Sequence, residues 1–220
     1  MAIKLETPSV EYIDHMGSDI AVANAARVSF AKEVSDFTDK EEKLINYLAK
    51  HNHWTPFGHQ QIKLRITNPI FLARQLVKHQ IGGVWNEESR RYISDDPTFY
   101  IPKEWHKKPE GHIKQGSGEC FDPVTNNYIT KRTLDHYFSC IDLYNDYLDM
   151  GMAPEQARMV LPLGTNTHWI WTGSLAFWAR VYNLRSDAHA QKDLKPFCEQ
   201  LDVIMSKLFP CSWKALKEFS

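Results

Sequence analysis

Polar side chains crowd the region around residues 74–79, and their spacing suits a bound ligand. Arg74 with Lys78, and Gln75 with His79, form two pairs spaced four residues apart, which brings each pair to one face of a helix. Two cations at that spacing repel each other unless an anion or an acid lies between them. A phosphate would relieve that repulsion, although a solvated helix face accounts for the spacing equally well.

The residues that follow add hydrogen-bond donors to the same region. Residues 82–92, GGVWNEESRRY, combine two glycines, which permit close backbone approach, with a serine hydroxyl and two guanidinium groups. Ser89 lies in none of the usual contexts of a serine nucleophile, so we interpret it as a phosphate-binding hydroxyl, with a turn or helix cap as the alternative. The combination favours an oxyanion ligand.

Local patterns predict the elements that position these residues. Residues 62–67 alternate apolar and polar side chains with period two, which predicts a strand with one buried face. Asn68 is a suitable N-cap and Pro69 a suitable first residue for a helix over 69–80, which Gly82 and Gly83 would end. Upstream, Thr38 opens a capping box before a helix that should end near Lys50.

Further elements are predicted downstream. We expect a helix over 128–150 closed by Gly151, a short helix from Pro154 that carries Arg158, and a strand over 168–171. Thr172 or Ser174 can cap a helix that runs through Arg185, and Asp187 can open a last long helix toward Leu208. The turn-rich stretch 111–127 is interpreted as an excursion within one domain, residues 1–220, and strands mixed irregularly with helices favour an α+β fold.

Bulk composition narrows the class of protein. The 220 residues carry a formal net charge of -1, so there is no global basic field for binding nucleic acid. The chain contains neither a signal peptide pattern nor a membrane-spanning apolar stretch, so we expect a cytoplasmic protein, in the host cytoplasm if the source is viral. The four cysteines form no C-x-x-C pair, which indicates reduced thiols and no zinc cage.

Residues 78–92 resemble the signature of the flavin-dependent thymidylate synthases, in which Arg-His-Arg precedes Asn-Glu-x-Ser-x-Arg-Tyr. The second part matches fully at residues 86–92. Lys78 and Gln80 replace the two arginines, one extra residue precedes Ser89, and the two glycines stand where a serine is usual. Lysine loses the bidentate fork and glutamine loses the charge, so we expect rearranged flavin contacts.

The resemblance extends over residues 50–191, through HWTPF at 53–57, PIFLARQ at 69–75, ARMVLPL at 157–163 and NLRSDAHAQ at 183–191. It implies the single-domain thymidylate synthase-complementing fold, with a mixed sheet and long helices, in a homotetramer whose sites are shared between chains. It also implies reductive methylation of dUMP to dTMP without a cysteine nucleophile. Methylenetetrahydrofolate would supply the carbon, and NADPH would reduce FAD, which supplies hydride.

The same resemblance implies residue roles. Arg185 would be catalytic, pairing with the uracil edge and favouring its N3 anion, whereas without the family it is equally a helix C-terminal arginine. Glu87 would accept from the sugar hydroxyl or orient an arginine. The implied dUMP contacts are Gln75, Leu76, Val77, Lys78, Glu87, Glu88, Ser89, Arg90, Arg91, Arg158 and Arg185, and the implied FAD contacts are His53, Thr55, Lys78, His79, Gln80, Ser174, Leu175, Ala176 and Arg180.

Three other functions remain open from the residues. His51, His53 and His59 could bind a metal in a hydrolase, but no Asp or Glu lies between Lys43 and Asn86, so we expect no metal site. Cys211 follows a proline, as does the nucleophile of cysteine-dependent thymidylate synthases, without the rest of that pattern. The aromatic residues could instead stack bases in an RNA-binding module, against which the near-zero charge argues.

Overall fold

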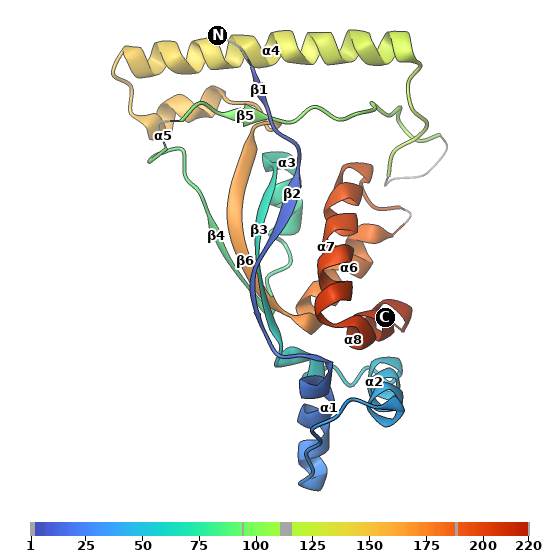
Figure 1. Ribbon diagram of the computed structural model, residues 1–220. Helices are drawn as coiled ribbons and strands as arrows, with labels where there is room; N and C mark the ends of the chain where they lie inside the picture. The colour runs from blue at the N-terminus through green and yellow to red at the C-terminus, as the bar shows by residue number, and fades with distance from the viewer. Residues whose placement is uncertain (1–2, 94, 111–115, 188, 220) are drawn as a thin grey trace.

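A four-stranded antiparallel sheet forms the centre of the computed structural model, which describes residues 3–93, 95–110, 116–187 and 189–219 (Figure 1). A short parallel pair of strands lies at one end of this sheet. The strand order of the sheet is β2-β3-β6-β4, so β4 lies at an edge. The strands are β1 Lys4–Leu5, β2 Ser9–Met16, β3 Gln61–Pro69, β4 Gly83–Glu87, β5 Thr98–Phe99 and β6 Asn166–Ser174.

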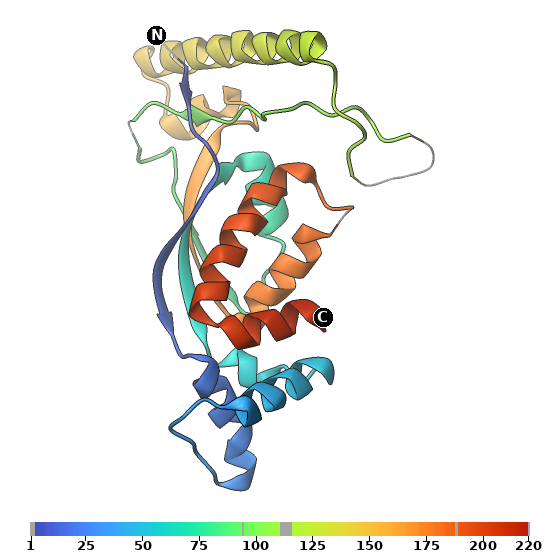
Figure 2. The same ribbon diagram turned by 45° about the vertical axis from the view of Figure 1, so that its right-hand side comes forward.

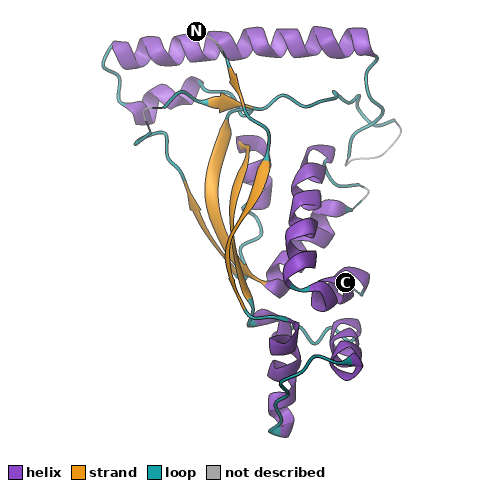
Figure 3. Cartoon of the chain, in the orientation of Figure 1, coloured by secondary structure: helices purple, strands orange, loops and turns teal. Residues whose placement is uncertain are grey.

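Helices cover one face of the sheet and both of its ends (Figure 2). α6, α7 and α8 lie on the covered face, α1 and α2 lie beyond one end, and α4 crosses the other end, as the colouring by secondary structure makes plain (Figure 3). The helices are α1 Asp19–Arg27, α2 Asp39–Lys50, α3 Ile70–Leu76, α4 Pro123–Asp149, α5 Pro154–Ala157, α6 Leu175–Ser186, α7 Lys195–Leu208 and α8 Pro210–Glu218, with short 3-10 turns at η1 Val28–Phe30, η2 Thr55–Gly58, η3 Arg158–Val160 and η4 Lys192–Leu194. No described helix is long and apolar enough to cross a membrane.

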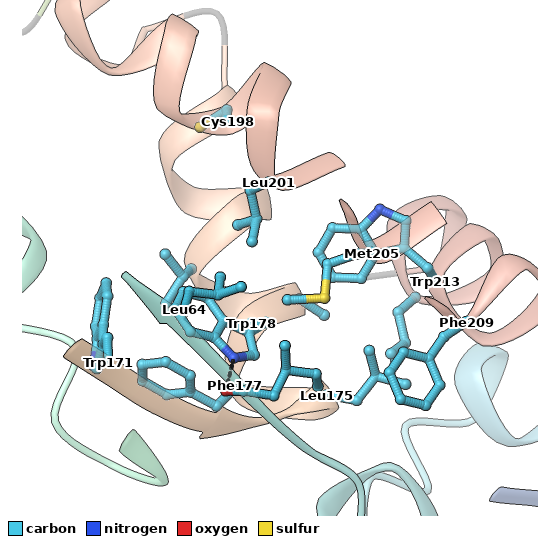
Figure 4. Packing of buried hydrophobic residues seen from close by; sticks show 14 of the residues in the cluster. Leu64, Trp171, Leu175, Phe177, Trp178, Cys198, Leu201, Met205, Phe209 and Trp213 are labelled. Atoms are coloured by element: carbon cyan, nitrogen blue, oxygen red, sulfur yellow. Dashed lines mark hydrogen bonds between the residues drawn. The ribbon is translucent and has the colours of Figure 1, made fainter. Parts of the chain in front are cut away.

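The core fills the space between the sheet and the covering helices. Trp171 and Leu64 project from β6 and β3 toward Trp178 on α6 and Met205 on α7 (Figure 4). The indole of Trp178 donates from Nε1 to the carbonyl oxygen of Ile62 at 3.2 Å, so its one polar group is satisfied inside the core. A sheet packed against helices agrees with the predicted α+β class, but the expected mixed sheet is wrong, because the four-stranded sheet is antiparallel throughout. A smaller second cluster contains Phe99, Tyr137 and Ile141.

Local signals predicted several elements correctly. The alternating segment lies in β3, where Ile62, Leu64 and Ile66 are fully buried. Thr38 and Glu41 form the expected capping box of α2, which ends at Lys50. Of the two candidate caps for α6, Ser174 is the N-cap, because its hydroxyl accepts from the amide of Phe177.

Other boundaries were wrong. Asn68 does not cap a helix but lies within β3, and α3 begins at Ile70 and already ends at Leu76. β3 extends two residues beyond its predicted end because Asn68 and Pro69 still pair with β6, so the helix begins one residue later than predicted. Residues 83–87, for which the sequence predicted no regular element, form the edge strand β4 along β6.

Two further helix starts differ from expectation. The DPVTNN stretch, interpreted as a turn, opens α4, because the Asp122 carboxylate accepts from the amides of Val124 and Thr125 and Pro123 occupies the first turn. Residues 111–115 of that turn-rich stretch lie outside the described residues. Asp187 ends α6 instead of opening the last long helix, which starts at Lys195, and the additional helix α8 follows it.

Candidate active site

A pocket of about 680 Å³ opens beside the C-terminal end of α6. Gln75 of α3 and Arg185 of α6 both line it, so two of the residues expected to contact dUMP lie on one cavity. Its remaining wall comes from the chain around Ser117 and from the connection between α6 and α7. The volume lies within the range of small-molecule sites.

Arg185 is held in place by a buried histidine. Its Nε lies 2.9 Å from Nε2 of His79, and because a guanidinium can only donate, His79 must accept at Nε2 and carry its proton on Nδ1. Burial, together with the charges of Arg185 and Arg180, lowers the pKa of His79 to about 4. His79 is therefore a neutral acceptor at neutral pH.

Gln75 presents an unused acceptor at the same pocket. Its Oε1 is buried and has no hydrogen-bond partner among the described residues. An unpaired buried carbonyl is costly, so a ligand that donates there would be favoured. Arg185, on the same pocket, can donate to a carbonyl oxygen of an imide, and the rings of uracil and flavin both present such an edge.

The other residues expected to contact FAD differ in their exposure and in their position relative to His79. Lys78 and Gln80 are exposed on either side of it, and Arg180 donates to the carbonyl oxygen of Ile81, which fixes the turn after α3. Together these groups add positive charge and amide groups near the pocket, which fits an anionic cofactor such as FAD. His53 and Thr55 are exposed in the segment leading into η2, which packs against α6.

The N-terminus of α6 offers less to a pyrophosphate than we expected. The amide of Leu175 already donates to the carbonyl oxygen of Gln60 at 3.0 Å, and that of Phe177 donates to the Ser174 hydroxyl. Ala176 lies between them and is half-buried. The side chain of Leu175, like that of Leu76 on α3, is fully buried in the core, so only the backbone of either residue could reach a ligand.

Gly83 serves packing rather than ligand approach. A Cβ at this position would lie 2.6 Å from Cζ of Phe177 and 3.0 Å from the indole nitrogen of Trp171. Its partner across the ladder, Gly173, would place a Cβ only 2.1 Å from Cδ1 of Phe177. The expectation that this glycine admits a ligand is therefore wrong, because the Phe177 ring fills the space. Gly82 has a φ of +85°, which glycine adopts without strain.

The second group of expected substrate contacts lies after β4. Glu87 accepts from the hydroxyl of Thr167 at 2.7 Å and from the indole of Trp85 at 3.2 Å, so its carboxylate is already engaged within the sheet. Ser89 lies in a turn, and its hydroxyl accepts from Nε of Arg91 at 3.2 Å. Arg91 is exposed, and the pair presents a hydroxyl and a guanidinium together at the surface.

The structure separates these two groups within one chain. Glu88 and Arg90 line a second pocket of about 420 Å³, which shares no lining residue with the pocket at Arg185. β4 lies at the sheet edge beyond β6 (Figure 1), and although its first residue Gly83 meets Phe177 of α6, its last residue Glu87 lies at the opposite end of the strand. Arg158 is exposed in η3 and donates to the carbonyl oxygen of Glu155, and it lines neither pocket. Val77 follows α3 and is half-buried.

The rival chemistries find little support in the described part of the chain. There, the one group of His, Cys, Asp and Glu side chains with metal-ligand spacing is Glu104, His106 and Cys120, not the three histidines around His53. Lys192 brings its ammonium within 3.5 Å of Nδ1 of His106, which disfavours a cation at that nitrogen. Burial, followed by the charges of Asp19 and Glu42, raises the pKa of Cys211 to about 12, which disfavours a thiolate nucleophile.

Sequence reasoning missed residues that shape both pockets. Ser117 and Gln191 line the pocket at Arg185, and His168 joins Glu88 in the second pocket. His168 was noticed only as part of a strand. Its place on the uncovered face of β6, where it alternates with the buried Trp169, was the available signal that it contacts something other than the core.

Comparisons with known proteins indicate one family. The profile of a family described as "Thymidylate synthase complementing protein" matches residues 11–211. A flavin-dependent thymidylate synthase of Wolbachia pipientis wMel is 37% identical over 96% of this chain and 74% of its own length, and one of Thermosipho africanus is 33% identical over 98% and 93%. The crystal structure of the UMP/dUMP methylase PolB from Streptomyces cacaoi, bound with 5-Br dUMP, superposes with a TM-score of 0.87 at 28% identity, covering 100% of this chain and 98% of PolB.

Proposed function

Because the chain belongs to the thymidylate synthase complementing protein family, that of the flavin-dependent thymidylate synthases, we propose that the pocket at Arg185 binds the pyrimidine ring of dUMP for its reductive methylation to dTMP. The observation that carries the proposal is the hydrogen bond from Arg185 to the neutral His79 beside the unpaired oxygen of Gln75. Arg185 thereby offers a fixed positive charge to the carbonyl edge of a planar imide, and Gln75 lines the same pocket.

In this proposal Arg185 is the catalytic residue. Its guanidinium lies against the pyrimidine edge and lowers the pKa of the N3 proton, which favours the more electron-rich N3 anion. His79 orients Arg185 from behind, because the Nε–H of Arg185 is committed to His79 and the terminal nitrogens are left for the ligand. The pocket walls would limit water around the reacting ring.

FAD, when bound, would supply hydride transfer, with NADPH as its reductant and methylenetetrahydrofolate as the carbon donor. The residues that would hold FAD are those near His79 and at the start of α6, and Lys78 and Arg180 are the cations among them that could pair with its phosphates. Lys78 offers a point charge and Gln80 offers amide groups, so flavin affinity depends more on Arg180 than the family signature suggests. The full set is His53, Thr55, Lys78, His79, Gln80, Ser174, Leu175, Ala176 and Arg180.

A complete dUMP site requires a second copy of the chain in this proposal. Ser89 and Arg91 would bind the phosphate from one protomer, while Arg185 binds the base from another, in a homotetramer. The separate pockets of the two groups within one chain support this assignment. Each protomer would be a single domain over residues 1–220, because one core cluster includes residues from Val10 to Leu216. The remaining phosphate-side contacts would be Glu87, Glu88, Arg90 and Arg158, with Gln75, Leu76, Val77 and Lys78 on the side of the base.

The decisive test is anaerobic NADPH oxidation by the FAD-loaded protein, with and without dUMP. We expect oxidation that depends on dUMP, and formation of dTMP once methylenetetrahydrofolate is added. Arg185→Ala should lower both rates by at least about 100-fold, the size expected for removing a charged transition-state contact. Arg132→Ala, an exposed arginine on α4, is the matched control. UMP is assayed in parallel, since the solved relative is described as acting on both nucleotides. Equal rates in the two variants would refute the role of Arg185.

A further inference from the structure

His168 on β6 joins two carboxylates from distant parts of the chain. Its Nδ1 lies 2.8 Å from Oε2 of Glu88, which follows β4, and its Nε2 lies 3.1 Å from Oε1 of Glu6, which follows β1. Glu6 is fixed in turn, because its second oxygen accepts from the hydroxyl of Thr98 at 2.6 Å. The imidazole therefore bridges the N-terminal segment and the segment that leaves β4.

The main chain strengthens the same junction. The amide of Glu88 donates to the carbonyl oxygen of His168 at 2.9 Å, so both the backbone and the side chain of Glu88 bind one residue. One position later on β6, Trp169 stacks on Trp85 of β4 with ring centroids 4.2 Å apart. The end of β4 is thus anchored to β6 just before Ser89.

The charge of His168 matters as much as its position. Hydrogen bonds to Glu88 and Glu6, opposed by burial, raise the pKa of His168 to about 9, so the ring is a cation at neutral pH. Without that cation, the Glu88 carboxylate would lie uncompensated next in sequence to the hydroxyl of Ser89 and would repel a phosphate. The other charged groups around the same pocket are Lys4, Arg90, Asp95 and Asp96.

We propose that His168 is a positioning residue, which holds residues 88–91 in the geometry that binds the substrate phosphate and neutralises Glu88 beside it. This inference rests on the proposed function, in which Ser89 and Arg91 bind the phosphate of dUMP. His168 itself touches no substrate. Its role is exerted through the Glu88 backbone and carboxylate.

The kinetic test uses His168→Gln and His168→Phe in the FAD-loaded full-length protein, with His136→Gln and His136→Phe on α4 as matched controls. We expect the KM for dUMP to rise about tenfold in His168→Phe, the loss typical of one charge-assisted hydrogen bond, while kcat at saturating dUMP changes less than about twofold. In the unchanged protein the KM should rise as the pH passes about 9. The rise of KM near pH 9 should persist in His136→Gln. In His168→Gln, the part of the rise that comes from deprotonation of His168 should be absent.

A second measurement needs no turnover. Hydrogen exchange of the backbone amides in residues 86–92, in the ligand-free protein, should become about tenfold faster in His168→Phe than in His136→Phe. If dUMP proves not to be the substrate, the hydrogen-exchange rates still decide whether His168 holds residues 88–91 in place. Unchanged exchange in both His168 variants would overturn the proposal, as would a KM for dUMP that equals that of the controls.

Discussion

The Nε of Arg185 and the Nε2 of His79 lie 2.9 Å apart, and this hydrogen bond joins the end of α6 to the turn after α3. His79 is only 9% exposed. Burial first, and then the neighbouring guanidinium groups, hold its pKa at about 4, so the acceptor needed by Arg185 is present throughout the physiological pH range. The orientation of Arg185 therefore depends on the protonation state of His79.

Removing the acceptor at His79 should therefore misplace Arg185. We expect His79→Phe to lower kcat for dUMP methylation by about 10- to 100-fold, since a hydrogen bond to a charged group contributes ~1.5–3 kcal/mol. His79→Gln keeps an acceptor oxygen and should retain more activity than His79→Phe. Steady-state kinetics at pH 7.5 decides this, with bound flavin measured in each variant because His79 is also an expected FAD contact. Equal activities of the two variants would show that the acceptor is irrelevant.

The two perturbed histidines should give stability a maximum near pH 6.5. His79 titrates near 4 when folded and near 6.5 when unfolded, so the unfolded chain binds the extra proton between these values and stability rises with pH. His168 titrates near 9 when folded, so the folded chain holds the extra proton above 6.5 and stability falls as the pH approaches 9. Below pH 4, protonation of Glu6 and other carboxylates adds to the loss.

Urea denaturation across pH 4.5–9.5 can separate the rise in stability below pH 6.5, the acid limb, from the fall in stability above pH 6.5, the alkaline limb. His79→Gln should flatten the acid limb, which we expect to be worth up to about 2 kcal/mol. His168→Gln should flatten the alkaline limb, worth about 1 kcal/mol after screening at this partly exposed site. His136→Gln should leave both limbs in place. An alkaline limb that persists in His168→Gln would show that another group causes it.

The elements that sequence reasoning predicted well are those with a local cause. The capping box of Thr38 and Glu41, the alternation in β3 and the Ser174 cap are all decided within a few residues. The start of α4 also had a local signal, Asp122 followed by a proline, but its many turn-forming residues concealed it. At this position a helix-capping signal and a turn signal occur in the same residues, and the local sequence does not decide between them.

The site could be predicted only in part, because its contacts are distant in sequence. The role of Gly83 is decided by the ring of Phe177, and no feature of the GG dipeptide distinguishes space for a ligand from space for a core ring. His168 meets Glu88 across 80 residues and Glu6 across 162. Arg185 was a candidate through the resemblance, whereas its bond to His79, 106 residues away, needed the fold.

The glycines around Phe177 should tolerate no side chain. A Cβ on Gly173 would lie 2.1 Å from the ring, so we expect Gly173→Ala to lower the free energy of unfolding by ~1–3 kcal/mol or more through overpacking. Thr172→Ala, on the adjacent residue of β6, should cost far less, because that side chain is on the other face. Replacing Phe177 by Leu in the Gly173→Ala background should recover part of the loss, and denaturation of Gly173→Ala, Phe177→Leu and the double variant measures it. Additive losses would place the strain elsewhere.

Cys211 should be dispensable for methylation. Burial, Asp19 and Glu42 raise its pKa to about 12, so at pH 8 only about one thiol in 10⁴ is ionised. The Asp19 carboxylate accepts from the amides of Cys211 and Ser212 and so caps the start of α8. We expect Cys211→Ala to keep dTMP formation within about twofold of the unchanged protein, with Cys198→Ala as a control for loss of a buried thiol. Complete loss of methylation in a Cys211→Ala protein that still melts normally and still binds FAD would instead require a cysteine nucleophile, and would remove Arg185 from its catalytic role.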